Sequence, residues 1–223
     1  MKELGNKFPG MYFLKDKQFK LFTKNLVPGE SVYGEPLVKK KGIEYRYWDP
    51  RRSKLAAAVL KKISQVGLKK TDNVLYLGAS TGTTVSHFSD ILGDDGFIFA
   101  LDFAPRVVRE LVFLCEKRKN IAPILGDANR PDTFARRIGS IDFVYQDVAQ
   151  KNQAEIFLKN MRFLEPGAFG ILCVKARSID ISRNPKGIYN EVRHELEKEI
   201  TVVDFRTLDP FEKDHCMFVC KKI

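Results

Sequence analysis

The sequence predicts an α/β fold: a seven-stranded, doubly wound and mostly parallel sheet with an antiparallel strand, preceded by a small β-rich subdomain. Three observations predict this class. From residue 73 onward, strand-like apolar runs alternate with helix-like amphipathic runs, which implies right-handed crossovers and helices on both faces of the sheet. The stretch 207–215 between the last two strand-like runs is too short for a helix, so those strands should pair antiparallel. Residues 1–47 hold short strand-like runs divided by turn residues, and they form the expected N-terminal domain.

A β-hairpin is predicted within this N-terminal domain. The apolar runs 11–14 and 19–22 flank residues 15–17, and this pattern is typical of two strands joined by a tight turn. The pattern changes at Trp48, so the second domain is expected to span residues 48–223. Trp48 itself is expected to pack between the two domains rather than to stack on a base.

In the second domain, the predicted elements alternate along the chain. Strands are expected at residues 74–77, 97–101, 121–125, 141–145, 169–174, 201–206 and 216–220. Helices are expected at residues 53–67, 83–92, 105–119, 131–137, 152–163 and 185–199. The first of these helices has one apolar face and should end at Gly67, because glycine commonly follows the last helical residue.

The composition favours an anionic partner and a reducing environment. Lys and Arg total 38 and Asp and Glu total 28, so the formal net charge is +10, which favours nucleic acid, although the basic residues are spread along the chain. The 4 cysteines lack metal-ligand spacing, so free thiols and no metal site are expected, which fits the cytoplasm. The chain lacks a secretory signal and an apolar stretch that could span a bilayer, so a cytoplasmic location without a membrane partner is expected.

A glycine-containing loop follows the first strand of the second domain and predicts a ligand site. Small residues let the backbone approach a ligand closely, and the next helix begins with free N–H groups. Gly78 and Gly82 are separated by Ala79-Ser80-Thr81, which differs from the G-x-G-x-x-G pattern of pyrophosphate binders. This loop therefore better suits a nucleoside that carries an amino-acid carboxylate.

Acidic residues follow the next three strands, at the edge of the sheet where ligands bind in such folds. Asp102 is placed to accept hydrogen bonds from two ribose hydroxyls, Asp127 from an adenine amino group, and Asp147 follows the fourth strand. Each acid taken alone is more often a helix cap or a turn residue, but their combination beside the loop predicts a nucleoside site. Ribose recognition fits both NAD and S-adenosylmethionine, and the loop argues against NAD. The sequence therefore predicts a Rossmann-like class I methyltransferase that uses S-adenosylmethionine.

Several longer segments resemble one particular family, the fibrillarins. The segments are residues 8–10, 25–30, 45–58, 75–87, 147–150 and 210–215, and together they span nearly the whole chain in the family's order. The chain lacks a Gly/Arg-rich N-terminal extension, so it resembles the archaeal form. Two departures are visible: Asp102 stands where the family usually has Glu, and the loop reads Ser80-Thr81-Gly82 where Ala-Ser-Gly is common.

The resemblance implies ribose 2′-O-methylation of ribosomal RNA and transfer RNA, directed by a box C/D guide RNA. It also implies two protein partners, a Nop-domain scaffold protein and a kink-turn-binding protein of ribosomal type. Transferred residue by residue, it implies that the cofactor contacts Gly78, Ala79, Thr83, Thr84, Asp102, Phe103, Asp127, Ala128, Asp147, Val148, Ala149 and Gln150.

Related 2′-O-methyltransferases use a lysine–aspartate–lysine core with a fourth polar residue. Similarity assigns these roles to Lys54, Asp147, Lys175 and His215. The protein must align the sugar oxygen with the methyl group and remove or stabilise the proton. The sequence leaves open whether Lys175 is a general base or an orienting cation, and His87 is expected to be structural.

Two other functions stay open at this point. One is a methyltransferase whose acceptor is a protein side chain or a small molecule. The other is a non-catalytic subunit that supports assembly of a ribonucleoprotein. The glycine loop, the strand-end acids and the two lysines count against the second. The target nucleotides, the oligomeric state and the surface that contacts the scaffold are not encoded in any recognisable motif.

Overall fold

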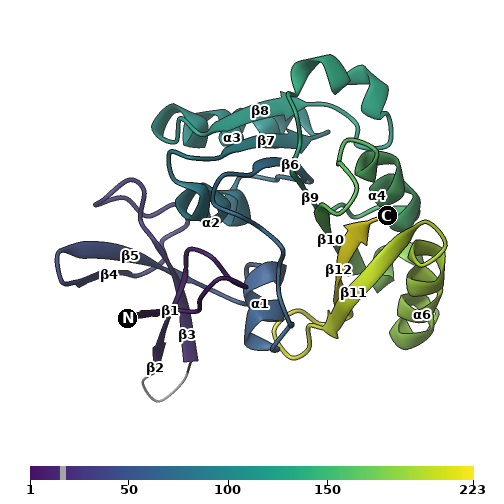
Figure 1. Cartoon of the computed structure of the whole chain (residues 1–223), viewed down its shortest axis with the longest axis horizontal. Coiled ribbons are helices and arrows are strands. Elements are labelled where there is room, and N and C mark those ends of the chain that lie inside the picture. Colours follow the sequence, from purple (N-terminus) through teal and green to yellow (C-terminus); the bar gives the residue numbers. More distant parts are fainter. Residues whose placement is uncertain (16–18) are drawn as a thin grey trace.

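The computed structural model describes residues 1–15 and 19–223, which form two β-sheets (Figure 1). The N-terminal sheet has the strand order β1-β2-β3-β5-β4 and is antiparallel throughout. Its strands are β1 (Lys2–Glu3), β2 (Met11–Lys15), β3 (Phe19–Lys24), β4 (Leu37–Lys40) and β5 (Ile43–Trp48). The antiparallel pairing of β2 with β3 agrees with the predicted hairpin. Of the predicted turn at residues 15–17, only Lys15 belongs to the described residues.

The second sheet has seven strands in the order β11-β12-β10-β9-β6-β7-β8. Its strands are β6 (Asn73–Leu77), β7 (Phe97–Asp102), β8 (Ile121–Leu125), β9 (Phe143–Gln146), β10 (Phe169–Lys175), β11 (Ile200–Thr207) and β12 (His215–Lys222). The strands from β10 to β8 are parallel, whereas β12 is antiparallel to both of its neighbours, β10 and β11. The predicted fold class and the antiparallel last pair are therefore confirmed.

Helices cover both faces of this sheet and complete two separate apolar cores. The helices are α1 (Lys54–Leu60), α2 (Thr83–Leu92), α3 (Pro105–Lys117), α4 (Gln153–Met161), α5 (Ala176–Ile179) and α6 (Pro185–Leu196). Helices α1, α2 and α3 pack on one face, and α4 and α6 pack on the other. Alternate residues of each strand enter alternate cores, because successive side chains of a strand point to opposite faces. Helix α1 lies between the N-terminal sheet and β12 (Figure 1).

The first predicted helix, residues 53–67, is wrong in its length, because α1 ends at Leu60. Lys62 adopts a left-handed conformation (φ 59°), and the amide of Ile63 donates to the carbonyl of Ala58, which closes the helix. Ile63 is still buried, so the apolar periodicity continued past the end of the helix. Gly67 does not end a helix: its φ is +75°, and an added Cβ would lie 2.3 Å from the ring of Phe169.

Two smaller predictions also differ from the structure. The predicted helix at 131–137 is a pair of short 3₁₀ turns, Pro131–Thr133 and Ala135–Arg137, because the segment is too short and irregular to continue as an α-helix. Helix α5 directly follows β10 and was not predicted, because its four residues carry no periodic signal.

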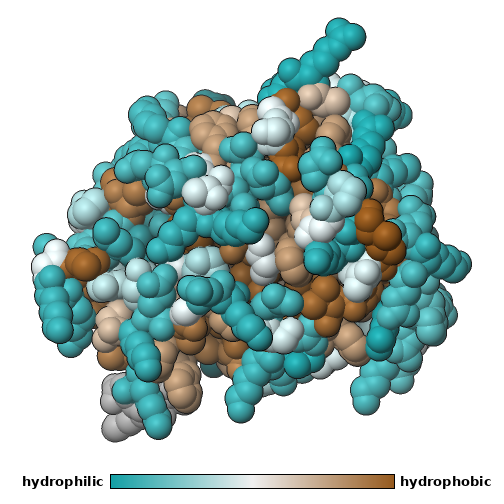
Figure 2. Space-filling model, viewed as in Figure 1, coloured by the Kyte–Doolittle hydropathy of each residue, from teal (hydrophilic) through white to brown (hydrophobic). Residues whose placement is uncertain are grey.

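Hydrophilic side chains cover most of the face seen in Figure 2, and apolar side chains show between them. Within the described residues, no helix is both long and apolar enough to cross a bilayer. All cysteines are free thiols; Cys115 is half-buried and the others are buried.

One buried carboxylate, that of Asp90 on α2, joins the N-terminal sheet to the helices that cover the seven-stranded sheet. Its Oδ2 accepts hydrogen bonds from Thr23 Oγ1 at 2.7 Å and from Arg46 Nη1 at 2.8 Å. Its Oδ1 accepts from the amide of Leu26 at 3.0 Å and from Arg118 Nη1 at 2.6 Å. A charge this deeply buried is tolerated only when it is paired and hydrogen-bonded, and here its partners come from both sides of the junction.

Trp48 and His87 fill the same junction. The two rings stack with centroids 4.7 Å apart at an angle of 13°, and both side chains are fully buried. His87 Nδ1 lies 2.8 Å from Thr23 Oγ1, whose hydroxyl proton is already donated to Asp90, so Nδ1 is the donor in that contact. Burial, and then Arg46 and Arg118, lower the pKa of His87. Trp48 therefore packs where the N-terminal sheet meets α2, and His87 is structural, as predicted.

Removal of the Asp90 charge should destabilise the whole fold. In Asp90→Asn the amide keeps the shape of the side chain but leaves two buried guanidinium groups facing a neutral group. We expect the free energy of unfolding to fall by roughly 3–5 kcal/mol, seen as a lower urea midpoint. The exposed Asp94, just beyond α2, is the control, and Asp94→Asn should change stability by no more than about 0.5 kcal/mol. Equal midpoints for the two variants would contradict this role of Asp90.

Candidate active site

The carboxyl ends of the parallel strands meet at one edge of the sheet, and their loops enclose a cavity of about 290 Å³. The strand order reverses between β6 and β9, which is where open α/β sheets bind ligands. The cavity is lined by Gly78, Ser80, Leu101, Asp102, Phe103, Gly126, Ala128, Asp147, Val148, Ala149 and Gln150.

The loop after β6 is held tightly against the ends of β7 and β9. The amides of Gly78 and Ala79 both donate to the carbonyl of Leu101, at 2.9 and 3.0 Å. Gly78 has φ +83°, and a Cβ there would lie 2.2 Å from the carbonyl oxygen of Asp147. Glycine is therefore required at residue 78 by both conformation and space. Ser80 also adopts a left-handed conformation, with φ 50°.

Asp102 connects this loop to the cavity. Its Oδ2 accepts from the amide of Ser80 at 2.9 Å, and its Oδ1 accepts from the amide of Ala104 at 3.1 Å. Each carboxylate oxygen can accept a further hydrogen bond, so both can also bind hydroxyl groups in the cavity. The shorter aspartate stem thus reaches the loop and the cavity together. Phe103 follows at the rim, where the residue is 69% exposed.

Four of the predicted cofactor residues do not line this cavity. Ala79 and Thr84 lie in the loop and at the start of α2, and Asp127 lies between two lining residues. Asp127 Oδ1 accepts from the amide of Asn129 at 2.9 Å, so this carboxylate also stabilises a turn. Thr83 faces a different cavity. The lining residues that sequence reasoning missed are Ser80, Leu101 and Gly126, and their positions directly beside predicted residues are the only signal in the sequence.

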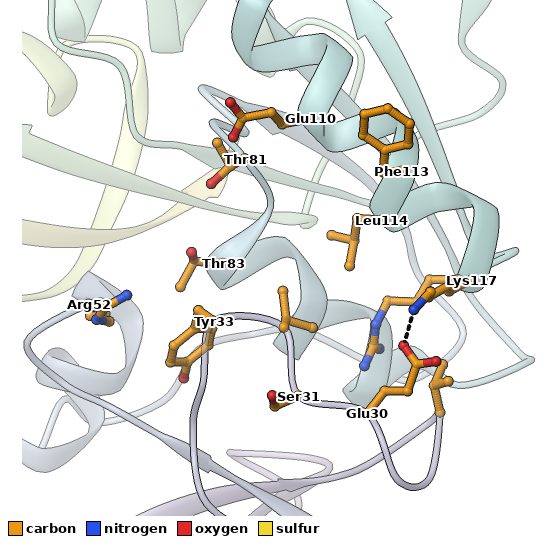
Figure 3. Close-up of a pocket in the computed structure, with 13 residues that line it drawn as sticks. Glu30, Ser31, Tyr33, Arg52, Thr81, Thr83, Glu110, Phe113, Leu114 and Lys117 are labelled. Carbon is orange, nitrogen blue, oxygen red and sulfur yellow. Dashed lines mark hydrogen bonds and ion pairs between the residues drawn. The ribbon is translucent and has the colours of Figure 1, made fainter.

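That second cavity, of about 420 Å³, lies between the loop of residues 27–33, helix α3 and the start of α2 (Figure 3). Thr81 and Thr83 lie along one side of it, and Arg52 lies beyond Tyr33. The ion pair between Lys117 and Glu30 lies at the opposite end. Since Ser80 lines the first cavity and Thr81 the second, the loop after β6 forms a wall between them.

Lys54 and Asp147 form an ion pair at the edge of the first cavity. Lys54 Nζ lies 2.8 Å from Asp147 Oδ2, although the two residues are 93 positions apart in the chain. The side chains are 17% and 26% exposed. Burial alone would lower the pKa of Lys54, but Asp147 and, more weakly, Glu212 raise it above its ordinary value. Lys54 is therefore a fixed positive charge at neutral pH and cannot accept a proton.

Lys175 and His215 lie opposite each other on β10 and β12. Paired residues of neighbouring strands point to the same face, so these side chains are neighbours. His215 Nδ1 lies 2.7 Å from the carbonyl oxygen of Lys213, which can only accept, so Nδ1 carries the proton. Burial, followed by the charge of Lys54, lowers the pKa of His215. The ring is thus neutral near pH 7, and no group within residues 1–15 and 19–223 forms a hydrogen bond with its Nε2.

The four predicted catalytic residues therefore meet in one cluster. Lys54, Asp147 and Lys175 all act on the pKa of His215. Lys54 and Asp147 are in direct contact, whereas the Lys175 side chain is exposed and forms no ion pair within the described part of the chain. Glu212, which sequence reasoning did not single out, also belongs here: burial raises its pKa, and Lys54 opposes that shift.

The site joins a small-molecule cavity to an oriented charge pair. Asp147 lines the cavity and also binds Lys54, so a group held in the cavity would lie beside a carboxylate that can accept a hydroxyl proton in a hydrogen bond. Among residues 1–15 and 19–223, no three His, Cys, Asp or Glu side chains cluster as metal ligands.

Comparisons with known proteins agree on one family. A family model described as Fibrillarin matches residues 3–223. A fibrillarin-like rRNA/tRNA 2′-O-methyltransferase of Thermococcus onnurineus is 48% identical over 225 residues, with 100% of each chain covered. The structure of Aeropyrum pernix fibrillarin with natively bound S-adenosyl-L-methionine is similar at a TM-score of 0.87 and 44% identity, covering 95% of this chain and 94% of that one. A fibrillarin/Nop5p complex is similar at a TM-score of 0.87 and 37% identity, covering 96% and 98%.

The charge of Lys54 should be measurable at His215. Because Lys54 lowers the pKa of His215, Lys54→Met should raise that pKa towards its ordinary value of about 6.5. Asp147 raises the same pKa, so Asp147→Asn should lower it further. An NMR titration of the imidazole Cε1 protons would measure both changes. The signal of the exposed His194, which lies beside Glu197, serves as the internal reference. A His215 pKa that falls in Lys54→Met would contradict the arrangement of charges.

Proposed function

The chain belongs to the fibrillarin family, and on that premise we propose that it transfers a methyl group from S-adenosylmethionine to ribose 2′-hydroxyls of ribosomal and transfer RNA. We further infer that a box C/D guide RNA selects the target within a ribonucleoprotein. The guide pairs with the target, so the protein needs no reader of base sequence. The formal net charge of +10 is suited to such an RNA partner.

The observation that carries the proposal is the double role of Asp147. This carboxylate belongs to the wall of the strand-end cavity and is also the partner of Lys54. A methyl group of a ligand in the cavity and a hydroxyl group bound by the cluster would therefore both lie next to the Asp147 side chain. Alignment of this kind supplies much of the rate of a transfer between two bound groups.

The residues around the cavity suit S-adenosylmethionine. The carboxylate of Asp102 offers acceptors for a ribose diol, and the exposed ring of Phe103 can cover an adenine. The predicted contacts of the amino-acid carboxylate, Thr83 and Thr84, lie outside this cavity at the start of α2, where free amide groups can bind a carboxylate. The bound cofactor supplies a methyl group that is already activated on a sulfonium.

The chain's own residues would orient and polarise the hydroxyl. Asp147 accepts the hydrogen bond from the 2′-hydroxyl, which increases the nucleophilicity of the oxygen. Lys54 remains charged and fixes the orientation of the carboxylate, so it takes no proton. His215 holds a neutral Nε2 that can accept a hydrogen bond, and Lys175 places a positive charge beside it. We assign these roles as part of the proposal.

A scaffold protein with a Nop domain is the expected protein partner. The similarity to fibrillarin in its complex with Nop5p, over 96% of this chain, supports this assignment. We infer the kink-turn-binding protein of ribosomal type from the family alone, as the component that would anchor the guide RNA.

Loss of the Lys54 charge should abolish most of the activity without loss of the cofactor. We expect Lys54→Met to reduce the methylation rate by about 10²–10⁴-fold, because Asp147 loses its orienting partner. The measurement is single-turnover methylation in a particle reconstituted with guide RNA and both partner proteins, with the methylated nucleotide mapped on the target. Lys186→Met, at an exposed lysine on α6, is the matched control and should keep the wild-type rate. Full activity in Lys54→Met would remove the ion pair from the mechanism, and methyl transfer to protein instead of RNA would overturn the function.

The Asp102 carboxylate should govern affinity for the cofactor. In Asp102→Asn one charged acceptor becomes an amide that also donates, so the Kd for S-adenosylmethionine should rise by about 10- to 100-fold, the cost of a charged hydrogen bond. Titration calorimetry would measure it. Asp102→Glu, the residue more common in the family, should bind within a few-fold of wild type, and Asp95→Asn at an exposed site is the control. An unchanged Kd in Asp102→Asn would rule out ribose recognition by this side chain.

A further inference from the structure

We propose that Gln153 is a positioning residue that holds the catalytic strand end at Lys175 and the cofactor loop ending at Gln150 in one fixed relation. This inference rests on the proposed function, because it concerns the same site. Gln153 is the first residue of α4 and lines neither cavity, so it contacts neither the cofactor nor the RNA directly. Its side chain is fully buried.

The carboxamide of Gln153 connects the two segments through their backbones. Its Oε1 accepts from the amide of Lys175 at 2.9 Å, and its Nε2 donates to the carbonyl of Lys175 at 3.2 Å. The same Nε2 donates to the carbonyl of Gln150 at 2.7 Å. Both amide protons and the carbonyl oxygen are therefore used, and all of the bonds reach residues at the edge of the site.

The position of Gln153 follows from unequal strand lengths. The pairing of β9 with β10 ends at Leu172 and Gln146, but β10 continues to Lys175. Beyond Gln146 the chain leaves the sheet and forms the loop 147–150, so β10 loses its neighbour on that side. A carboxamide offers the same donor and acceptor as a peptide group, and Gln153 supplies them where the ladder is missing.

These hydrogen bonds also determine how closely the side chains of Lys175 and His215 approach each other. The backbone N–H and C=O of Lys175 both point towards Gln153, while the next amide, that of Ala176, donates to Asp214 on the opposite side. Lys175 and His215 therefore form a non-hydrogen-bonded pair of the antiparallel ladder, the kind in which side chains approach more closely. A shift of the Lys175 backbone would change the distance between these side chains directly.

A second buried amide holds Gln153 itself. Gln146, the last residue of β9, donates from its Nε2 to the backbone carbonyl of Gln153 at 2.7 Å. These hydrogen bonds thus connect the end of β9, through Gln153, to the end of β10 and to the loop 147–150. Every polar atom of the Gln153 carboxamide is hydrogen-bonded, whereas Gln146 Oε1 has no partner within residues 1–15 and 19–223. Loss of the Gln153 contacts would leave further buried polar groups unpaired, which is costly.

The test uses two variants of nearly equal volume in the reconstituted particle. Gln153→Glu keeps an acceptor for the Lys175 amide but places an oxygen without a proton against the carbonyls of Lys175 and Gln150. Gln153→Met removes all of the polar contacts. We expect kcat to fall on the order of 10²-fold in both, because a small misplacement of a catalytic group has that effect. The KM for RNA should stay within about twofold, and the Kd for S-adenosylmethionine should rise by about tenfold through Gln150.

The pH dependence separates positioning from mere stability. Burial raises the pKa of an introduced carboxyl group, and its protonated form regains one donor. The kcat of Gln153→Glu relative to wild type should therefore increase as the pH is lowered, whereas that of Gln153→Met should not. Asn120→Ala is the control, because Asn120 is a buried amide whose contacts, Ser89 and Gly93, lie outside the site. It should lower the urea midpoint without a change in kcat.

The outcomes distinguish this inference from the proposed function. If the wild-type particle methylates RNA and both Gln153 variants keep its kcat, the positioning role is wrong and the function stands. Loss of activity that follows only the loss of stability, as calibrated with Asn120→Ala, would also overturn the role. If the wild-type particle transfers no methyl group to RNA, the proposed function itself fails.

Discussion

The buried carboxylate of Asp90 is the constraint on which the arrangement of this protein depends. It binds groups from β3, from β5 and from the residue after α3, while it is itself carried by α2. Helix α2 begins where the loop after β6 ends, and β5 leads through a short turn into α1 and Lys54. The same ionic contact therefore holds in place the start of α2 and, through β5, the segment that carries Lys54, two parts of the candidate site. Since an uncompensated buried charge is costly, other arrangements of the N-terminal sheet on α2 are strongly disfavoured.

The active site combines one fixed charge pair with one neutral ring. Lys54 is kept protonated by Asp147, and its charge in turn helps to keep His215 neutral. The hydrogen bond from Nδ1 to Lys213 determines which nitrogen of His215 is free. The site can thus present a carboxylate and an uncharged acceptor side by side at neutral pH. This division suits a reaction in which the electrophile is already activated and the hydroxyl must only be oriented and relieved of its proton.

The sheet brings these groups together because neighbouring strands end at different positions along it: β10 extends beyond the last residue of β9 that pairs with it. Strand β9 ends at Gln146, and the chain then turns away to form one wall of the cavity. Strand β10 continues to Lys175, where β12 supplies His215 as its neighbour. The space left by the shorter strand is filled by the carboxamide of Gln153. The segments to which we assign catalysis and cofactor binding are therefore parts of one hydrogen-bonded edge rather than independent loops.

Chain order and local periodicity were enough to predict the fold class, the antiparallel last pair, the glycine loop and the strand-end acid Asp102. These features depend on neighbours in sequence: a strand alternates, a short connection forces antiparallel pairing, and a tight turn needs glycine. Periodicity identifies which side chains are buried but not what they are buried against. For that reason α1 was predicted too long, since Ile63 is buried with or without a helix around it. The pair formed by Lys54 and Asp147, the free Nε2 of His215 and the contacts of Gln153 join segments far apart in the chain, and only the packing of the tertiary structure decided them.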